Sequence, residues 1–313
     1  MEEIKGIVTA LSPVIHSESF SRAQDDEAKN RSDNTENVKP FRRMRYIFAA
    51  DNGYASRGVP VISGNSLRGV GRGLLVRHSL EDVLDITLED ILQDVKGAGT
   101  VAKFMTILFY KGGVTPKGIK ADGSVKAETY LGVQRAIPWL DLLGGVYAVR
   151  HFESALKVGI LAPVTYELAP LFAKDFPEVE PQLSLADIQE TVVRHTRTTM
   201  PGEDSKEDST QMIFAAATLP AGTRFYSYNV CHSESEGTLL AFRAMFALIK
   251  LYGFVGGMSS KGFGHVSCDY NLDATKAISE YDAYLKTHRE EIIASILSIA
   301  TDFGYTLSEK DKK

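Results

Sequence analysis

The residues best suited to chemistry lie between Ser63 and Arg72, where a predicted short strand turns into a predicted helix. The segment reads SGNSLRGVGR, and Asn65 and Ser66 are residue types preferred at helix N-caps. Arg68 and Arg72 are four residues apart, so they share one face of the helix. Free N–H groups and the positive dipole end of a helix start, beside two arginines, favour an anion such as a sugar-phosphate backbone.

Three glycines follow inside the same periodic pattern, at positions 69, 71 and 73. Each glycine costs a helix about 1 kcal/mol relative to alanine. Such a cost is understandable where another backbone must approach the helix closely, and that of a bound RNA is one candidate. Close packing of the helix on a sheet, with solvated arginines, is the alternative that this motif leaves open.

A second glycine cluster, Gly253 to Gly264, reads GFVGGMSSKGFG and joins an apolar helix to a strand. It lacks the glycine-to-lysine spacing of a P-loop and leads into a strand rather than a helix. Its backbone amides, with Ser259, Ser260 and Lys261, are suited to holding phosphate by hydrogen bonds. A plain helix-to-strand turn is the competing interpretation.

Charge is distributed unevenly along the chain. The net charge is -5, from 40 acidic and 35 basic residues. Between Phe41 and His78, however, Asp51 is the only acid. That stretch holds seven arginines, at positions 42, 43, 45, 57, 68, 72 and 77. Such a separation predicts a local polyanion-binding surface on an acidic body.

The cysteine content and the apolar runs of the chain indicate its cellular compartment. The chain has two cysteines, Cys231 and Cys268, which are far apart in sequence and do not suggest a disulfide framework or a cysteine-rich zinc site. The N-terminus lacks the order of a signal peptide, and no apolar run reaches membrane-spanning length. We expect a soluble cytoplasmic protein with no membrane partner, no metal and no cofactor.

The predicted elements alternate between strands and helices, with long insertions. Strands are predicted over residues 4–15, 43–50, 60–63, 101–110, 152–166, 223–231 and 262–268. Helices are predicted from near Asn65, over 80–95, over a short segment from Ser184 to Val193, over 239–251 and over 274–300. This order suggests a single elaborated α+β domain spanning 1–313 and built on a ferredoxin-like sheet. Its insertions are a mobile segment over 17–40, a helical, finger-like segment over 80–128 and an arm over 184–213.

Four motifs in order resemble the repeat-associated CRISPR superfamily. Gly64 to Arg72 is similar to its G-x-S-x-(K/R)-G-x-x-R element, and GGMSSKGFGHV resembles its C-terminal glycine-rich loop. AIPWLDLLGG resembles its D/N-P-x-x-x-L-F-G segment, although Ile137 and Leu143 depart from the usual residues. LPAGTRFYSY matches its G-T-x-F strand. The pattern is most similar to the backbone subunit of the type IV complex, with type III and type I-D relatives as alternatives.

The resemblance implies a modified RNA-recognition-motif palm, finger-like insertions and a thumb hairpin that kinks a guide RNA (crRNA). The arm would be that thumb, with phosphate contacts and an apolar wedge at its base; a solvated hairpin is the alternative for it. The predicted RNA-binding residues are His16, Ser17, Arg42, Arg43, Arg45, Asn65, Ser66, Arg68, Arg72, Gln134, Arg135, Arg194, His195, Arg197, Met200, Met212, Ser259, Ser260, Lys261 and Phe263. For His16 a satisfied polar role is equally compatible. Trp139, Phe214, Phe225 and Tyr226 could stack on bases but are expected in the core, as is usual for aromatic residues at strand and helix positions.

The loop after the first strand decides between binding and cutting. Type III backbone subunits cut target RNA with an aspartate there, whereas here the loop runs from Ser12 to Phe20 without one. We therefore expect a non-catalytic subunit that polymerises along crRNA, copy to copy, with other CRISPR subunits and a target paired to the guide. The alternatives are a metal-dependent endoribonuclease using Asp25 or Asp26, and a protein-interaction domain whose glycines serve packing only. Cys231 beside His232 lacks the third partner of a nucleophile triad.

Overall fold

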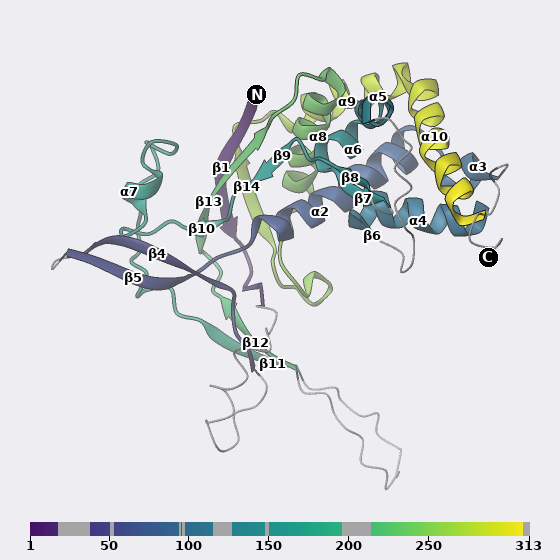
Figure 1. Cartoon of the computed structure of the whole chain (residues 1–313). Coiled ribbons are helices and arrows are strands. Elements are labelled where there is room, and N and C mark those ends of the chain that lie inside the picture. The colour runs from purple at the N-terminus through teal and green to yellow at the C-terminus, as the bar shows by residue number, and fades with distance from the viewer. Residues whose placement is uncertain are drawn as a thin grey trace, which may run out of the picture.

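The computed structural model describes residues 1–17, 38–50, 53–93, 95, 98–114, 127–147, 150–195 and 214–308. It is a mixed α+β fold with antiparallel sheets, as expected. A sheet stands at one side and a large set of helices extends from it (Figure 1). Within the described residues no helix combines the length and apolar character needed to span a membrane.

The central sheet is built around β1 (Glu2–Ala10), which pairs antiparallel with β13 (Arg224–Cys231) and β14 (Val266–Tyr270). On its other side β13 pairs with two short strands, β9 (Leu156–Val158) and β10 (Ala162–Pro163). The order is therefore β10–β13–β1–β14. The predicted strand over 152–166 is thus several short ones.

Two helices cover one face of this sheet: α2 (Gly64–Arg77) and α8 (Glu236–Tyr252). On β1 the side chains of Ile4, Val8 and Ala10 are buried in the core beneath them, with the alternation of a half-covered strand. A Cβ on Gly71 would lie 2.8 Å from the side chain of Met245 on α8. This glycine therefore permits close contact between α2 and α8.

Further helices carry the core away from the sheet (Figure 1). They are η2 (His78–Val83, a π-helix), α3 (Leu88–Leu92), α4 (Ala98–Lys111), α5 (Ala127–Ala136), α6 (Pro138–Leu143), α9 (Ala274–Thr287) and α10 (Arg289–Ser308). The strand prediction for 101–110 is wrong, because this apolar run is α4. The predicted helix over 274–300 is two helices that meet at His288.

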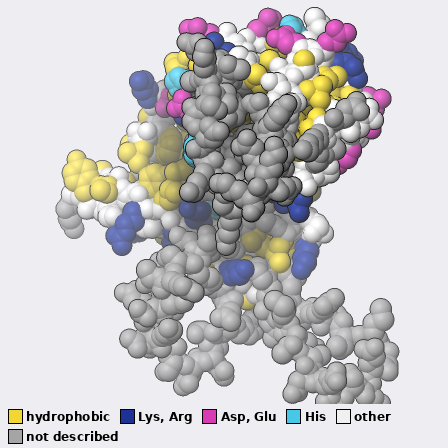
Figure 2. Space-filling view, turned by 45° about the vertical axis from the view of Figure 1, so that its right-hand side comes forward, with side chains coloured by type: hydrophobic (Ala, Val, Ile, Leu, Met, Phe, Trp, Pro, Cys, Tyr) yellow, Lys and Arg dark blue, Asp and Glu magenta, His cyan; other side chains and the backbone are white. Residues whose placement is uncertain are grey.

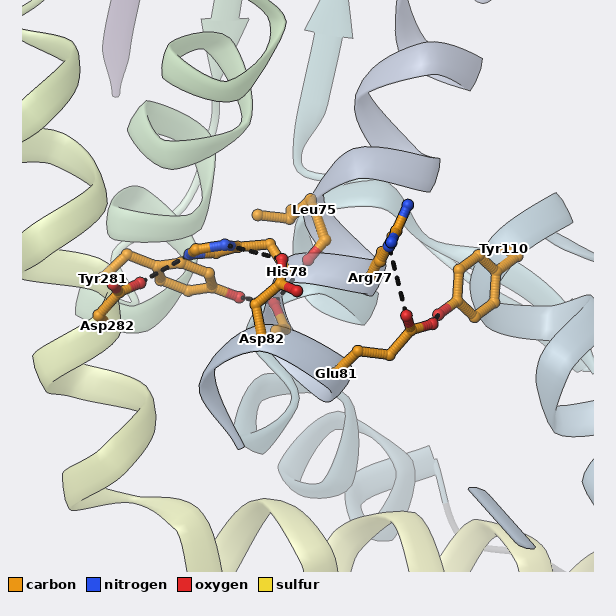
Figure 3. A network of polar contacts seen from close by, with 9 residues as sticks. Leu75, Arg77, His78, Glu81, Asp82, Tyr110, Tyr281 and Asp282 are labelled. Carbon is orange, nitrogen blue, oxygen red and sulfur yellow. Dashed lines mark hydrogen bonds and ion pairs between the residues drawn. The ribbon is translucent and has the colours of Figure 1, made fainter. Parts of the chain in front are cut away.

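A polar network fixes the C-terminal end of α2 to this helical region (Figure 3). The Ser79 hydroxyl contacts the Leu75 carbonyl at 2.7 Å and the Tyr281 hydroxyl at 2.8 Å. His78 Nε2 lies 2.7 Å from Asp282 of α9. Because Ser79 and Tyr281 are buried, these bonds satisfy groups that water does not reach.

Smaller sheets surround the central one. The hairpin of β4 (Arg43–Ala50) and β5 (Gly53–Pro60) projects from the body, and β11 (Thr191–His195) and β12 (Phe214–Leu219) point away from it (Figure 1). β12 also pairs with β2 (Val14–Ile15) and β3 (Val38–Lys39). A three-stranded sheet joins β6 (Gly113–Val114), β7 (Gly145–Tyr147) and β8 (Arg150–Phe152). The short helix predicted from Ser184 is absent from the described residues, which show turns and then β11.

Candidate nucleic-acid interface

Three segments that hold predicted RNA-binding residues meet where β1 ends. They are the loop over residues 12–17, the start of α2 over 63–66, and the glycine-rich loop over 256–264. We call this meeting point, together with Arg42, the basal junction. The segments are distant in sequence, and hydrogen bonds of the backbone and of the His16 side chain join the first segment to each of the other two.

His16 ties the first segment to the helix. Its Nε2 accepts a hydrogen bond of 3.1 Å from the backbone N–H of Ser63, the N-cap of α2. The His16 carbonyl accepts from the Arg42 N–H at 2.8 Å. Burial, helped by the charge of Arg42, lowers the pKa of His16 from 6.5 to about 4. At neutral pH the imidazole is therefore an uncharged acceptor, which is the form that the bond to Ser63 requires.

The glycine-rich loop lies against the other side of the same segment. The Gly257 N–H donates to the Ile15 carbonyl at 2.8 Å, and the Gly264 N–H donates to the Pro13 carbonyl at 2.9 Å. Gly256 has φ +79°, and a Cβ there would lie 2.4 Å from the Ile15 carbonyl oxygen. Glycine is required at this position by both its conformation and its contact.

The cap of α2 is Ser63, two residues before Asn65 and three before Ser66, the two residues expected at the cap. Its hydroxyl accepts from the Ser66 N–H at 3.3 Å, and its side chain is 9% exposed. Asn65 is exposed, whereas Ser66 is partly buried. Since Ser63 satisfies one orphan donor, Asn65 is the residue of the predicted pair that is free to face a ligand.

Exposed and basic groups border the junction. Lys261 is exposed, as is Ser260, while Ser259 and Phe263 are partly buried. Arg42 is partly buried, and its Nε is a buried donor without a hydrogen-bond partner among the described residues. A buried unsatisfied donor next to a surface is a group that an added acceptor would satisfy. Ser17 forms a β-bridge with Phe41 and lies beside Arg42.

Arg68 and Arg72 face into the protein. The Arg72 guanidinium, 7% exposed, donates to the carbonyls of Phe109, Leu143 and Gly144 at 3.3, 2.9 and 3.0 Å. Arg68 also donates to the Leu143 carbonyl. Burial lowers the pKa of both, that of Arg72 to about 10, where the charge of Arg68 adds to the effect. Both remain cations at neutral pH and bind the C-terminal carbonyls of α4 and α6, so this geometry gives the predicted phosphate contact of Arg72 no support.

Gln134 and Arg135 lie at the opposite end of the sheet. They line a cavity of about 720 Å³ together with Met1 and His232. His232 follows Cys231, the partner of Glu2 in the β1–β13 ladder, whereas the junction adjoins Ala10. Gln134 is 6% exposed and donates to the Glu153 carbonyl at 2.7 Å. The structure therefore does not bring this pair together with the junction residues.

Of the remaining predicted RNA-binding residues, some lie on the small sheets and others lie outside the described residues. Arg43 bonds to Glu190 at 2.6 Å and to the Gly58 carbonyl, while Arg45 is exposed on the β4–β5 hairpin. Arg194 and His195 lie at the end of β11, and their backbones pair with β12. Arg197, Met200 and Met212 lie outside the described residues, as do Asp25 and Asp26. The base of the predicted thumb, β11 and β12, is joined to the junction through β2, which ends one residue before His16.

The surface agrees with the sequence charge pattern. In Figure 2 the acidic side chains drawn in colour gather on the upper, helical part of this face, and the coloured charges of the lower half are basic.

Some features of the junction could be predicted from the sequence and others could not. The contacts of Pro13 and Ile15 with the glycine-rich loop are made by backbone groups, so side-chain types give no signal of them. Ser63 as the cap was detectable, because serine is itself among the residue types preferred at a helix N-cap.

Comparisons with known proteins find likeness in fold but not in sequence. No protein-family profile matches the chain, and no curated protein matches it. A chain in a solved structure described as "Type IV-B CRISPR Complex" is similar to it with a TM-score of 0.53 and 19% identity. The similarity covers 86% of this chain and 90% of that one. The predicted type IV resemblance is confirmed at the level of fold.

Removal of the buried Arg72 guanidinium should greatly lower the stability of the fold. Arg72→Met leaves the carbonyls of Phe109 and Gly144 without this donor, while the Leu143 carbonyl keeps its bond to Arg68, so the free energy of unfolding should fall by about 3 kcal/mol. Denaturant unfolding followed by circular dichroism measures the change. Arg77→Met on the same helix is the matched control, because its ion pair with Glu81 is exposed and contributes less than about 1 kcal/mol. Equal effects of the two substitutions would contradict the assignment.

The His16 contact predicts acid sensitivity. The folded pKa of about 4 lies below the ordinary 6.5, so between these values the unfolded chain binds more protons. The contribution of His16 is therefore complete above pH 6.5 and lost as pH falls toward 4, by up to about 3 kcal/mol. His16→Gln keeps an acceptor that does not titrate, so its unfolding free energy should fall less over this window. An identical pH profile for the two proteins rules out the assigned role of His16.

Proposed function

We propose that the chain is a non-catalytic, sequence-independent RNA-binding subunit of a CRISPR ribonucleoprotein, holding the guide-RNA backbone at the basal junction. The observation that carries the proposal is that three segments with predicted RNA-binding residues converge at one end of β1, although they are separated by up to some 250 residues. The fold likeness to a chain of a type IV-B CRISPR complex supports the same class of assembly.

The core of the chain fits a ferredoxin-like palm of the RNA-recognition type. Such a palm has the order β-α-β-β-α-β. Here the corresponding elements are β1, α2, β10, β13, α8 and β14, and the spatial order places β1 and β13 in the centre. In this arrangement the loop over 12–17, which follows β1, and the loop over 256–264, which precedes β14, lie at the same end of the palm. One strand of RNA can therefore contact both loops.

Phosphate binding at the junction is proposed to use donors that the fold leaves available. The first turn of α2 supplies backbone N–H groups and the positive dipole end, and Asn65 adds an exposed amide. Lys261 supplies an exposed charge from the facing loop, and Arg42 supplies a donor that lacks a partner. Arg68 and Arg72 contribute indirectly, because their bonds to the carbonyls that end α4 and α6 hold α2 in the orientation that presents these groups.

The helix also offers room on its outer side. Nothing lies within 4 Å of a Cβ placed at Gly69 or Gly73, in contrast to Gly71, which contacts α8. Gly69 is exposed, four residues after Asn65 and hence on the same face. Open space next to the helix start suits the approach of a sugar-phosphate chain, which is the use we propose for this glycine.

Assembly along the RNA is the second part of the proposal. Copies of the chain would contact one another head to tail, since a heterologous contact that does not close forms an open helical filament. The described base of the thumb, β11 and β12, leaves the body beside the junction (Figure 1). That position is suitable for reaching the RNA held by the same or a neighbouring copy. Other subunits and a target paired to the guide would complete the complex.

Salt dependence tests the binding site. Lys261→Ala and Arg42→Ala should each weaken binding of single-stranded RNA several-fold and reduce the slope of log affinity against log salt by roughly 1. Fluorescence anisotropy across a salt series measures both quantities. Lys174→Ala is the control, because Lys174 is exposed on the segment after α7 (Ala169–Phe172), away from the junction. Unchanged slopes for both junction variants would overturn the site.

The absence of RNA cleavage is the fourth expectation. The described part of the loop after β1 carries no carboxylate, and burial raises the pKa of Cys231 to about 12, which removes it as a thiolate nucleophile. Guide-loaded protein with magnesium and labelled complementary RNA should leave the target intact on a denaturing gel. Regularly spaced products that disappear in Asp25→Asn or Asp26→Asn would establish the endoribonuclease alternative instead.

A further inference from the structure

Beyond the junction, a row of apolar and aromatic side chains crosses the end of the central sheet. Leu11, His265 and Phe254 are neighbours on three adjacent backbone segments, because the Leu11 N–H donates to the His265 carbonyl at 2.8 Å and Phe254 forms a β-bridge with His265. Opposite residues of antiparallel neighbours point to the same face of a sheet. The Phe254 and His265 rings are stacked, with centroids 5.1 Å apart, and Tyr252 lies 5.6 Å from Phe254.

This aromatic row is open to solvent. Leu11 is 51% exposed and Tyr252 is 43% exposed, and His265 is also exposed. The neighbours that point to the opposite face are buried, with Val255 at 2% and Val266 at 3%. Phe254, between them, is partly buried, so the row presents Leu11, Tyr252 and His265 outward where alternation would allow polar residues.

The remainder of the same sheet face is covered. Tyr226 on β13, 2% exposed, stacks on Phe172 at 4.5 Å and packs on Phe176 at 5.0 Å. Lys5 on β1 bonds to Asp175 of the same covering segment at 2.9 Å. In RNA-recognition sheets, aromatic residues on the central strands stack bases. Here that central position is filled by the protein's own side chains, and the exposed rings are at the end of the sheet.

The row adjoins the basal junction. His265 directly follows Gly264, whose N–H bonds to Pro13, and Lys261 lies in the same loop. In Figure 1 the loop after α8 hangs below the sheet on the side of β11 and β12. A strand whose phosphates contact the junction would thus have its next bases beside the row.

We propose that the aromatic row of Leu11, Tyr252, Phe254 and His265 is a base-stacking platform for the same RNA strand. The inference rests on the proposed function. Every base has a π-face, so stacking on aromatic rings is tolerant of sequence, as a holder of varied guides requires. The neighbouring charge of Lys261 favours a polyanion over an apolar partner.

A tryptophan reporter tests the platform. The chain has one tryptophan, Trp139, and it is 1% exposed, so its emission is a constant background. In Tyr252→Trp, titration with oligouridine should quench the new indole as a base stacks on it. Tyr166→Trp is the control, because Tyr166 is 59% exposed on a different part of the surface, and its emission should stay unchanged.

Affinity separates stacking from charge. Tyr252→Ala should weaken oligouridine binding roughly 5- to 100-fold without changing the salt slope, because no cation is removed. Tyr252→Phe keeps the ring and should bind as the unaltered protein does. A cooperative thermal unfolding transition is the control that each variant is folded.

The outcomes distinguish the two proposals. If the unaltered protein binds no RNA, the proposed function and the platform both fail. Full-strength RNA binding with an unquenched Tyr252→Trp overturns the platform alone. A blue shift of the Tyr252→Trp emission with rising protein concentration, in the absence of RNA, also overturns the platform. The aromatic row would then be covered by a second copy of the chain. Such a copy could pair with β14, which within the described residues is paired only to β1.

Discussion

A buried guanidinium fixes the direction of α2, and the rest of the proposed site depends on that direction. Arg72 binds the carbonyls that end α4 and α6, where helix dipoles leave partial negative charge. Moving an arginine from water to the interior is costly unless its donors are satisfied, so the bonds hold only when all three elements are in place. The network around Ser79 and Tyr281 fixes the C-terminal end of the helix. Anchored at both places, α2 extends its first turn to His16, where the other two segments of the basal junction meet it.

The junction then connects chain segments that have little local reason to associate. His16 accepts from the cap residue of α2, and the glycine-rich loop binds the carbonyls on either side of Val14. These contacts use backbone groups and a neutral imidazole, which leaves cationic side chains at the rim for a ligand. Structural contacts and proposed ligand contacts are therefore made by different groups of the same short segments. The aromatic row extends this surface along the end of the sheet.

Sequence reasoning predicted the parts that local chemistry determines. The strand β4 was predicted with its observed bounds, the ends of β13 and α8 within a few residues, and the positive-φ glycines of the second cluster explain why that loop was recognisable. Trp139, Phe225 and Tyr226 are in the core, as expected. The type IV likeness in fold followed from motif order, although no single motif is specific.

The features that the sequence does not determine depend on distant partners. The run 101–110 is apolar on most of its residues, so periodicity alone does not separate a buried strand from a buried helix. The partners of Arg72 lie 37, 71 and 72 residues away, and the spacing of Arg68 and Arg72 identifies a shared face without saying whether it points inward. Gln134 is among the predicted RNA contacts, yet its amide donates to the Glu153 carbonyl at the other end of the sheet.

Ultraviolet cross-linking of the protein to its copurifying RNA, followed by mass spectrometry of the linked peptides, tests the central claim most directly. The account predicts cross-links in peptides that contain residues 12–17, 63–69 and 252–265, with none from α9 or α10. Cross-links confined to the helical region, or to the cavity at Gln134 and Arg135, would contradict it.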